Sequence, residues 1–567
     1  MSIKRSLLSL SIASLLAACG GSNSSVPIPP IGVTPPPPPS ASTNVTTTGV
    51  ITGFGSVIVN GVRYDTNGSD ISTDDSPAAT ESDLAVGMVV SISGTLDADG
   101  QSGSANVIRY NAEVEGVVNR IDLANQQLRV LGQWISYDDL TEFDDVTLNS
   151  LSIGDVVEVS GYRVGDGSFY ATRIELEEFD NDLKVRGIVS GLNTAAQTFM
   201  LGELTVNYAG AELDDFGSTA LANDLMVKVE GEGGSYDVSS NILQAREIEL
   251  QAAAIDADDG DVLKLEGAIS NYQTGASFVL AERTIFLDDD TDYRFGSAQE
   301  LADGVRVKIK AEYEDDRWEA EDIVFIRQAK TKLSGLVSSI DLAANTLSVS
   351  GETFLVTAQT QFEDESDSNV RLFDLSALTI NDFVKVLGFT NDDQVRVALK
   401  VERDNDDKNE IELKGKPSEI GSDFLVMFGN TIIVDADTEF DDNDRGITQQ
   451  EFFAMINTDT LIEVEAVRSG DVLLARELEI ERDDDEDDIG KVEFKGLITA
   501  VLENGIEVDG TSVLFDANTE LEIDEVELSI AAFLAAVVLG DEVEVEGFYN
   551  EDNQIIAEEV EVERNDD

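Results

Sequence analysis

The sequence predicts an all-β protein, a tandem array of seven small β-barrels, each with about five strands and a short helix between strands three and four. Three observations predict this fold class. Short sequence markers recur seven times in the same order after about residue 48, which indicates a repeat architecture. The strands within a repeat alternate apolar with polar residues, as half-buried strands do. The chain has 567 residues, which is too many for one ordinary core.

Three markers define the repeat. An early strand holds a glycine, an alternating strand such as Gly154–Gly161 follows, and a final strand holds an alanine with an aliphatic residue three positions later. The early glycines are Gly49, Gly116, Gly187, Gly267, Gly335, Gly415 and Gly496. The final pairs are Ala105/Ile108, Ala171/Ile174, Ala245/Ile248, Ala320/Ile323, Ala398/Val401, Ala475/Leu478 and Ala557/Val560. Repeats three to six each lack a glycine of the second marker, so we expect distorted barrels there.

The second repeat shows the local pattern best. Its predicted strands are Val114–Ile121, Gln127–Leu131, Trp134–Tyr137, Val156–Tyr162 and Phe169–Leu176, with a short helix near Leu148–Ile153. In the last repeat, Leu528–Leu539 has the spacing to bury a full helical face.

This order of three strands, a helix and two strands resembles the OB-fold, a small five-stranded barrel. The repeats also resemble an uncharacterised domain-of-unknown-function family that occurs in tandem in bacterial lipoproteins. The resemblance rests on the glycine strand, the Gly-Asp-x-Val-x-Val-x-Gly strand and the Ala-x-x-Ile ending. It implies OB-like β-barrels and no established activity.

The markers place the repeats at residues 48–113, 114–182, 183–255, 262–329, 331–403, 411–482 and 491–564. The early repeats follow one another almost directly, and acidic linkers separate the late ones. We therefore expect a rod or a curved string of barrels, in which each repeat contacts its neighbours in sequence.

The N-terminus resembles the signal of a bacterial lipoprotein. Lys4 and Arg5 precede the apolar run Leu7–Leu16, which is too short to span a bilayer, and Leu16-Ala17-Ala18-Cys19 resembles a lipobox. The resemblance predicts a signal peptide at residues 1–18 and lipid on Cys19, the only cysteine. Gly20 follows it, which favours the outer membrane, facing the periplasm or the cell surface. The alternative is an ordinary signal peptide with a chance cysteine.

A proline-rich segment follows Cys19. Residues 19–47 contain Pro35–Pro39 among serine, threonine and glycine, a composition that favours extended polyproline II over a packed core. We expect this segment to be a tether that holds the barrels away from the membrane.

The composition limits the partners. The chain has 113 acidic and 37 basic residues, a formal net charge of -76. Nucleic-acid binding depends on Lys and Arg at the phosphates, so no nucleic-acid partner is expected. Such a surface attracts divalent cations and basic proteins, although its simplest role is solubility. There is no histidine, the commonest general base and transition-metal ligand.

A Thr-x-Phe-acid-acid segment recurs as Thr141–Asp145, Thr360–Asp364 and Thr438–Asp442. Its carboxylates are the ligands that Ca²⁺ prefers, which makes Asp144, Asp145, Asp441 and Asp442 weak calcium candidates. The alternative is that the threonine ends a strand, the phenylalanine packs inward and the acids face water. No other cofactor is expected.

Catalysis has little support in the sequence. We find no Gly-x-Ser-x-Gly, P-loop or dinucleotide glycine pattern, and we expect Trp318 in a core rather than on a sugar-binding surface. The sequence favours a non-enzymatic binding or spacer scaffold at the cell envelope, with an envelope protein or a polysaccharide as a possible partner. The alternative is a calcium-dependent adhesion or matrix protein, and the remote alternative is a carbohydrate-active enzyme.

Overall fold

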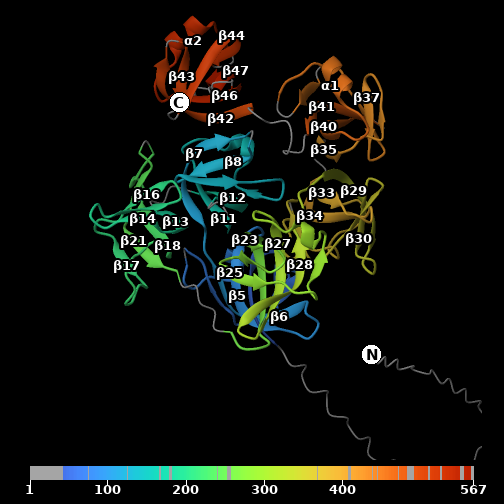
Figure 1. Cartoon of the computed structure of the whole chain (residues 1–567). Coiled ribbons are helices and arrows are strands. Elements are labelled where there is room, and N and C mark those ends of the chain that lie inside the picture. Colours follow the sequence, from blue (N-terminus) through green and yellow to red (C-terminus); the bar gives the residue numbers. More distant parts are fainter. Residues whose placement is uncertain are drawn as a thin grey trace, which may run out of the picture. The chain divides into compact units, whose positions relative to one another are not determined.

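The computed structural model in Figure 1 is all-β and contains seven barrels, one for each repeat. It describes residues 43–562, apart from residues 75, 124, 165–167, 178–181, 239, 252–256, 367, 406–409, 437, 443–444, 470–471, 482–490, 503, 509–510, 524–525 and 550–554. Cys19, the signal peptide and most of the tether lie outside the described residues. The first strand begins at Thr43, so the fold starts a few residues before the tether boundary that the sequence suggested.

The elements of barrels 1 to 3 have the following bounds. Barrel 1 contains β1 (Thr43–Gly53), β2 (Val57–Val59), β3 (Val62–Asp65), β4 (Asp70–Ser72), the 3₁₀ helix η1 (Glu81–Asp83), β5 (Val89–Leu96) and β6 (Ser102–Tyr110). Barrel 2 contains β7 (Val114–Asp122), β8 (Gln127–Val130), β9 (Gln133–Ser136), β10 (Glu142–Asp144), η2 (Leu148–Ser150), β11 (Val156–Arg163) and β12 (Phe169–Glu177). Barrel 3 contains β13 (Asp182–Ile188), β14 (Ser190–Asn193), β15 (Thr198–Leu201), β16 (Leu204–Asn207), β17 (Glu212–Asp214), β18 (Met226–Glu232), β19 (Tyr236–Asp237), β20 (Ile242–Gln244) and β21 (Glu247–Leu250).

Barrels 4 to 7 follow in the same way. Barrel 4 contains β22 (Val262–Ala268), β23 (Ser270–Gln273), β24 (Ser277–Leu280), β25 (Arg283–Phe286), β26 (Asp292–Arg294), η3 (Ala298–Glu300), β27 (Arg306–Glu314) and β28 (Arg317–Phe325). Barrel 5 contains β29 (Thr331–Asp341), β30 (Thr346–Val349), β31 (Glu352–Leu355), β32 (Gln361–Asp364), β33 (Phe383–Thr390) and β34 (Arg396–Asp404). Barrel 6 contains β35 (Glu410–Gly415), β36 (Glu419–Ile420), β37 (Phe424–Met427), β38 (Asn430–Ile433), β39 (Glu439–Asp442), α1 (Gln449–Met455), β40 (Leu461–Ser469) and β41 (Val472–Glu481). Barrel 7 contains β42 (Lys491–Leu502), β43 (Gly505–Val508), β44 (Thr511–Ile523), β45 (Val526–Glu527), α2 (Ile530–Ala536), β46 (Glu542–Tyr549) and β47 (Ile555–Val562).

Barrel 2 closes in the strand order of the OB-fold. β7 pairs with β8, β8 with β9, β9 with β12, β12 with β11, and β11 again with β7. Only the pairing of β9 with β12 in this ring is parallel. The same order recurs in the other barrels, although strand one is split in barrels 3, 4 and 6. The predicted OB-like fold class is therefore confirmed.

The glycine and alanine markers meet at a β-bulge. Gly161 on β11 lies opposite Ala171 on β12, at the point where the register shifts. A Cβ atom on Gly161 would come within 2.0 Å of the carbonyl oxygen of Tyr170, so the close approach excludes a side chain here. In barrels 4 and 6, Ala311 and Ala466 hold this position with the same bulge and closure. Replacement of this glycine by alanine therefore leaves the bulge intact in those two barrels, although their first strand is split.

The helix between strands three and four is shorter than the sequence suggested. Barrels 1, 2 and 4 have one 3₁₀ turn, and in barrel 7 α2 covers Ile530–Ala536 rather than Leu528–Leu539. The segment before it forms a short extra strand, such as β10, which pairs in parallel with the second half of strand five. This strand takes residues that the sequence pattern assigned to a loop.

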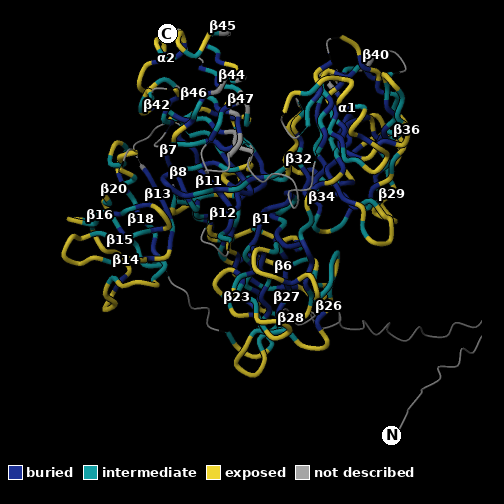
Figure 2. The backbone as a smooth tube through the Cα atoms, turned by 45° about the horizontal axis from the view of Figure 1, so that its top comes forward, coloured by how far each residue is buried: buried dark blue, intermediate teal, exposed yellow. Residues whose placement is uncertain are grey.

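Side chains fill the barrels. In barrel 5, Phe354 and Phe373 are almost completely buried, and barrel 7 packs Phe515 edge-on against Phe533. Figure 2 shows buried backbone along the strands and exposed backbone at many of the turns. Among the described residues, no helix has the length and apolar character needed to cross a membrane.

Strand one joins the barrels to one another. Its first half has a free edge, and such an edge is normally covered in native proteins. β1 pairs in parallel with β22, β7 pairs antiparallel with β13, and β29 pairs antiparallel with β35. Barrel 1 therefore shares a sheet with barrel 4, which lies three repeats further along the chain. The other two of these pairings join sequence neighbours, as in the expected string of barrels. The contact between barrels 1 and 4 departs from that string, because the markers carry no information about which free edges meet.

Candidate functional site

The recurring threonine of the Thr-x-Phe segment holds a fixed position in the barrel. The hydroxyl of Thr141 donates a 2.8 Å hydrogen bond to the carbonyl oxygen of Ala171, beside the bulge. The same contact joins Thr291 to Ala320, Thr360 to Ala398, Thr438 to Ala475 and Thr519 to Ala557, and Ser69 replaces the threonine in barrel 1. The segment is thus a structural latch that ties the short extra strand to strand five.

The calcium candidates lie in two different barrels. Asp144 on β10 forms an ion pair with Arg173, and Asp145 follows it with a φ of 56°. Asp441 and Asp442 lie on β39, where Asp441 bridges to Gly446. Within the described ranges, no group of three or more acidic, cysteine or histidine side chains is placed to hold a metal ion. Calcium binding stays a prediction that rests on the sequence.

Three other acids of barrel 2, namely Asp138, Asp139 and Glu142, contact cations from other barrels. Asp138 lies 2.7 Å from Arg306 of barrel 4. Asp139 lies 3.8 Å from Lys414 of barrel 6, and Glu142 lies 2.7 Å from Lys400 of barrel 5. We call these residues the junction segment. It brings one acidic stretch into contact with three other repeats.

Glu142 is the most buried carboxyl of this segment. It is 7 % exposed, and the side-chain amide of Gln361 donates to it. Burial raises the pKa of Glu142 to about 8, against the opposing charge of Lys400. Lys400 also lies 3.1 Å from Glu402, and its carboxylate neighbours hold the pKa of this lysine well above its usual value.

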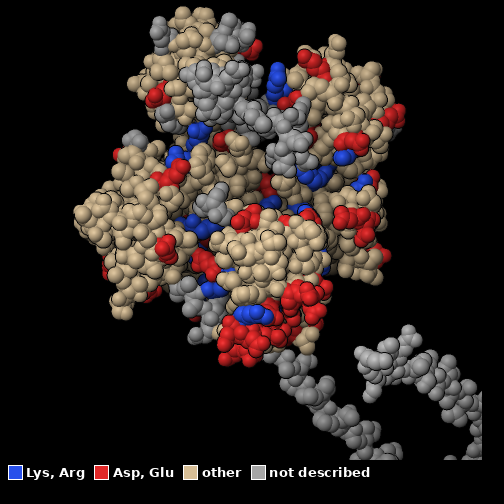
Figure 3. Space-filling model, viewed as in Figure 1, with Lys and Arg blue, Asp and Glu red and all other residues tan. Residues whose placement is uncertain are grey.

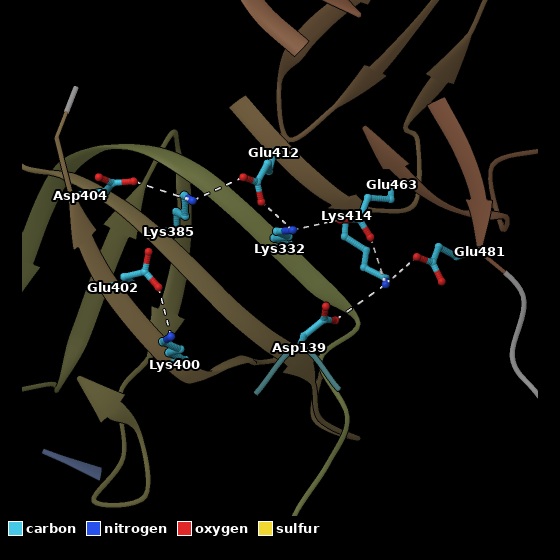
Figure 4. Close-up of polar contacts among 10 residues, drawn as sticks. All are labelled: Asp139, Lys332, Lys385, Lys400, Glu402, Asp404, Glu412, Lys414, Glu463 and Glu481. Carbon is cyan, nitrogen blue, oxygen red and sulfur yellow. Dashed lines mark hydrogen bonds and ion pairs between the residues drawn. The ribbon is translucent and has the colours of Figure 1, made fainter. Parts of the chain in front are cut away.

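A second set of ion pairs joins barrels 5 and 6, as Figure 4 shows. Lys332 lies 2.6 Å from Glu412 and 3.0 Å from Glu463. Lys414 lies 2.7 Å from Glu481 and 3.2 Å from Glu463. The two cations raise the acidity of Glu463, whose pKa falls to about 2 although burial opposes this. Barrels 5 and 6 are thus joined by alternating charges.

A small cavity lies where barrels 1, 2, 4 and 5 meet. Its volume is about 70 Å³, and its walls are mainly apolar, with Tyr162, Tyr170, Arg306 and Lys308 among the polar groups. The charges there are paired: Lys308 lies 3.4 Å from Glu266, and the Arg306 guanidinium stacks 4.1 Å from the Tyr170 ring centre. Such a space suits a few water molecules.

A larger cleft of about 1010 Å³ lies between barrels 5 and 6. Lys416 and Phe428 line it from barrel 6, and Arg396 lines it from barrel 5, where it pairs with Glu352. The cleft mixes both charges with apolar groups, so it offers room for a polar ligand without a strong preference of charge.

Sequence reasoning missed the junction cations. Lys184 pairs with Glu115 at 2.6 Å across β13 and β7, and both side chains are less than a tenth exposed. The first strands carry several charged residues, such as Asp182, Lys184 and Arg186 of β13, so nothing in the pattern singles out Lys184. Trp318, which we expected in a core, is half-buried against the hydrophobic core of barrel 4 and packs edge-on against Tyr313. Figure 3 shows acidic side chains in several groups on the face in view, the largest at its lower end, and basic side chains in smaller groups, many of them between barrels.

The fold and these junctions define a protein of tandem OB-like barrels joined by strand edges and ion pairs. The model of the family described as "Domain of unknown function (DUF5666)" matches residues 47–105, 115–175, 266–324, 334–402, 414–479 and 495–561. These segments cover more than half of the chain, which therefore belongs to this family. The third repeat falls outside the matched segments, although it has the same strand order. No curated protein matches the chain.

Proposed function

We propose that this protein is a non-enzymatic scaffold of the cell envelope, anchored in the outer membrane by lipid on Cys19. The scaffold role rests on one observation, which is that polar side chains at the barrel junctions join different repeats. Arg306 and Lys414 each pair with an acid of another barrel, and Lys400 donates a hydrogen bond to Glu142 of barrel 2, so these side chains hold repeats together. Because these basic side chains are paired at the junctions, the exposed surface carries an excess of carboxylates, which suits binding to basic partners.

The anchor rests on the lipobox pattern around Cys19 and on the proline-rich tether that follows it. Lipid on the only cysteine would attach the chain to the membrane, and several acyl chains together hold stably. The tether would give the barrels reach, and seven repeats would offer several contacts to one partner.

Metabolic labelling with an alkyne fatty acid tests the anchor. The native chain should incorporate the label and fractionate with outer membranes, and the Cys19→Ala variant should do neither. A native chain without label, or equal membrane association of both chains, would contradict the proposal.

A further inference from the structure

Barrels 6 and 7 contain equivalent helix segments that align without insertions or deletions. Thr448–Asp459 in barrel 6 and Ser529–Gly540 in barrel 7 each run from a helix N-cap to the start of strand four. The buried positions agree, because Phe452 and Phe533 are fully buried and Ile456 and Val537 nearly so. After the first helical residue, where Gln449 is exposed but Ile530 packs against the core of barrel 7, the two segments present the same positions to solvent.

The outward side chains differ sharply between these two segments. Four exposed positions of the barrel 6 segment are polar, namely Gln450, Glu451, Asn457 and Thr458. The equivalent residues of barrel 7 are Ala531, Ala532, Val538 and Leu539. Val538 is 58 % exposed and Leu539 is 63 % exposed. We call these four residues of barrel 7 the α2 patch; Figure 1 locates α2 in barrel 7. Contiguous exposed apolar surface of this kind marks an interaction site.

Barrel 1 shows what an apolar version of this segment does. The residues at the positions of Val538 and Leu539 are Ala85 and Val86, and in every other repeat at least one of the two is polar. Val86 is 7 % exposed and belongs to the hydrophobic core cluster of barrel 1, and residues of barrel 2 lie against the neighbouring Gly87. The guanidinium of Arg173 donates to the Val86 carbonyl oxygen at 3.3 Å, and Thr172 donates to the next carbonyl at 2.6 Å. Barrel 2, which lies against this segment of barrel 1, thus contributes an arginine to the contact.

The negative charge of barrel 7 indicates which kind of partner binds the α2 patch. Residues 491–562 contain 19 acidic and two basic residues. A second copy of this barrel or an anionic lipid surface would be repelled at distances within the Debye length. A protein surface with lysine or arginine around an apolar centre would be attracted and would cover the patch.

We propose that the α2 patch is a docking surface for a protein segment that has an apolar face bordered by lysine or arginine. This names the kind of partner that the scaffold binds, and in that sense it rests on the proposed function. The contact itself needs no lipid, so it is measured in solution.

The test uses residues 20–567 and a fluorescent amphipathic helical peptide of leucine and lysine. Anisotropy is recorded at 0.15 M and 0.5 M salt, which weakens binding by charge alone. The variant combines Ala531→Gln, Ala532→Gln, Val538→Asn and Leu539→Thr, which follow the polar residues of barrel 6 and use Gln at the position of Glu451, so that the charge is unchanged. We expect a Kd at least about tenfold weaker for the variant, because the apolar contact is lost. Unchanged melting of the variant shows that it folds.

The matched control replaces exposed apolar residues of barrel 5 by Leu372→Gln and Ile380→Thr, and it should bind as the native chain does. Equal binding by the native chain and the four-residue variant would overturn the proposal, since charge alone would then explain the affinity. So would an absence of binding at micromolar peptide. Flotation with zwitterionic vesicles, or a dimer in sedimentation that the variant abolishes, would assign the patch to lipid or to a second copy. Failure of fatty-acid labelling would leave all of these outcomes unaffected.

Discussion

At the scale of single residues, the hydroxyl contacts of the latch recur more regularly than the carboxylates beside them. Thr360 is 5 % exposed, and its hydroxyl donates to Ala398. The acids that follow the latch differ in their contacts: Asp364 pairs with Arg403, and Asp144 pairs with Arg173. The segment thus recurs because the barrel fold needs the latch hydrogen bond, whereas the acids beside it form ion pairs that differ from barrel to barrel.

Thr360→Val removes the latch hydroxyl while keeping the shape of the side chain. We expect the free energy of unfolding to fall by about 1–3 kcal/mol, because the carbonyl of Ala398 loses a buried hydrogen bond. Chemical denaturation measures the loss. Thr353→Val, at an exposed position of β31 in the same barrel, is the control and should change stability by less than about 0.5 kcal/mol. Equal effects of the two substitutions would show that the latch does not contribute.

Glu142→Gln tests the buried carboxyl of the junction segment. The pKa of Glu142 is about 8 in the folded chain, above the value of about 4.3 expected when unfolded. The folded state therefore holds this proton more tightly, and its contribution to stability is present below pH 4 and is lost as the pH rises through 8. The amide cannot ionise, so the variant should be more stable than the native chain at pH 8, by an order of 1–3 kcal/mol, with a smaller gain at pH 5. Parallel melting curves at pH 5, 6.5 and 8 measure this, and an unchanged pH dependence would contradict it.

At the scale of elements, the two α-helices differ at their first turn. The Thr448 side chain accepts a hydrogen bond from the backbone of Glu451, and the Glu451 carboxylate accepts one from the Thr448 backbone, which completes a capping box. Ser529 caps α2 without a side-chain hydrogen bond, and Ala532 stands where Glu451 would be.

Ala532→Glu should complete the box in barrel 7. We expect a gain of about 0.5–1 kcal/mol in the unfolding free energy of this barrel, since the glutamate carboxylate accepts a hydrogen bond from the backbone N–H of Ser529. The matched change is Glu451→Ala in barrel 6, which should lose a similar amount. Both are measured by thermal denaturation, and a loss of stability on Ala532→Glu would contradict the expectation.

The elements also show where sequence reasoning stops. Val114 and Val156 begin strands that the alternation of apolar residues located correctly, because burial on one face imposes a period of two. The short strand β10 was missed, since two of its three residues, Glu142 and Asp144, are acidic and its strand partner is remote in sequence. The junction partners were also missed, because pairing of Glu142 with Lys400 joins residues 258 positions apart. The apolar periodicity locates a strand, but it does not indicate which of the seven similar strand edges that strand pairs with in another barrel.

At the scale of the whole molecule, the barrels are joined unequally. Barrels 1 and 4 share four paired residues of β1 and β22, and Glu266 also accepts a hydrogen bond from the backbone of Val50. Barrel 7 meets barrel 2 through a single bridge between Lys495 and Ile121, with Arg120 over the Phe494 ring. The strength of a join therefore does not follow distance along the chain.

Removal of barrel 7 should thus leave the rest of the chain folded. A chain that ends at Glu481 loses the bridge at Lys495 and the contact of Arg120 with the Phe494 ring. We therefore expect calorimetry to show the main melting transition within about 3 °C of the native chain. Removal of residues 43–113 bares the edge of β22 and leaves Arg173 without its barrel 1 acceptor, so that chain should melt earlier by at least about 5 °C. A cost for the loss of barrel 7 as large as that for barrel 1 would show that all repeats stabilise one another equally, against the unequal joins described above.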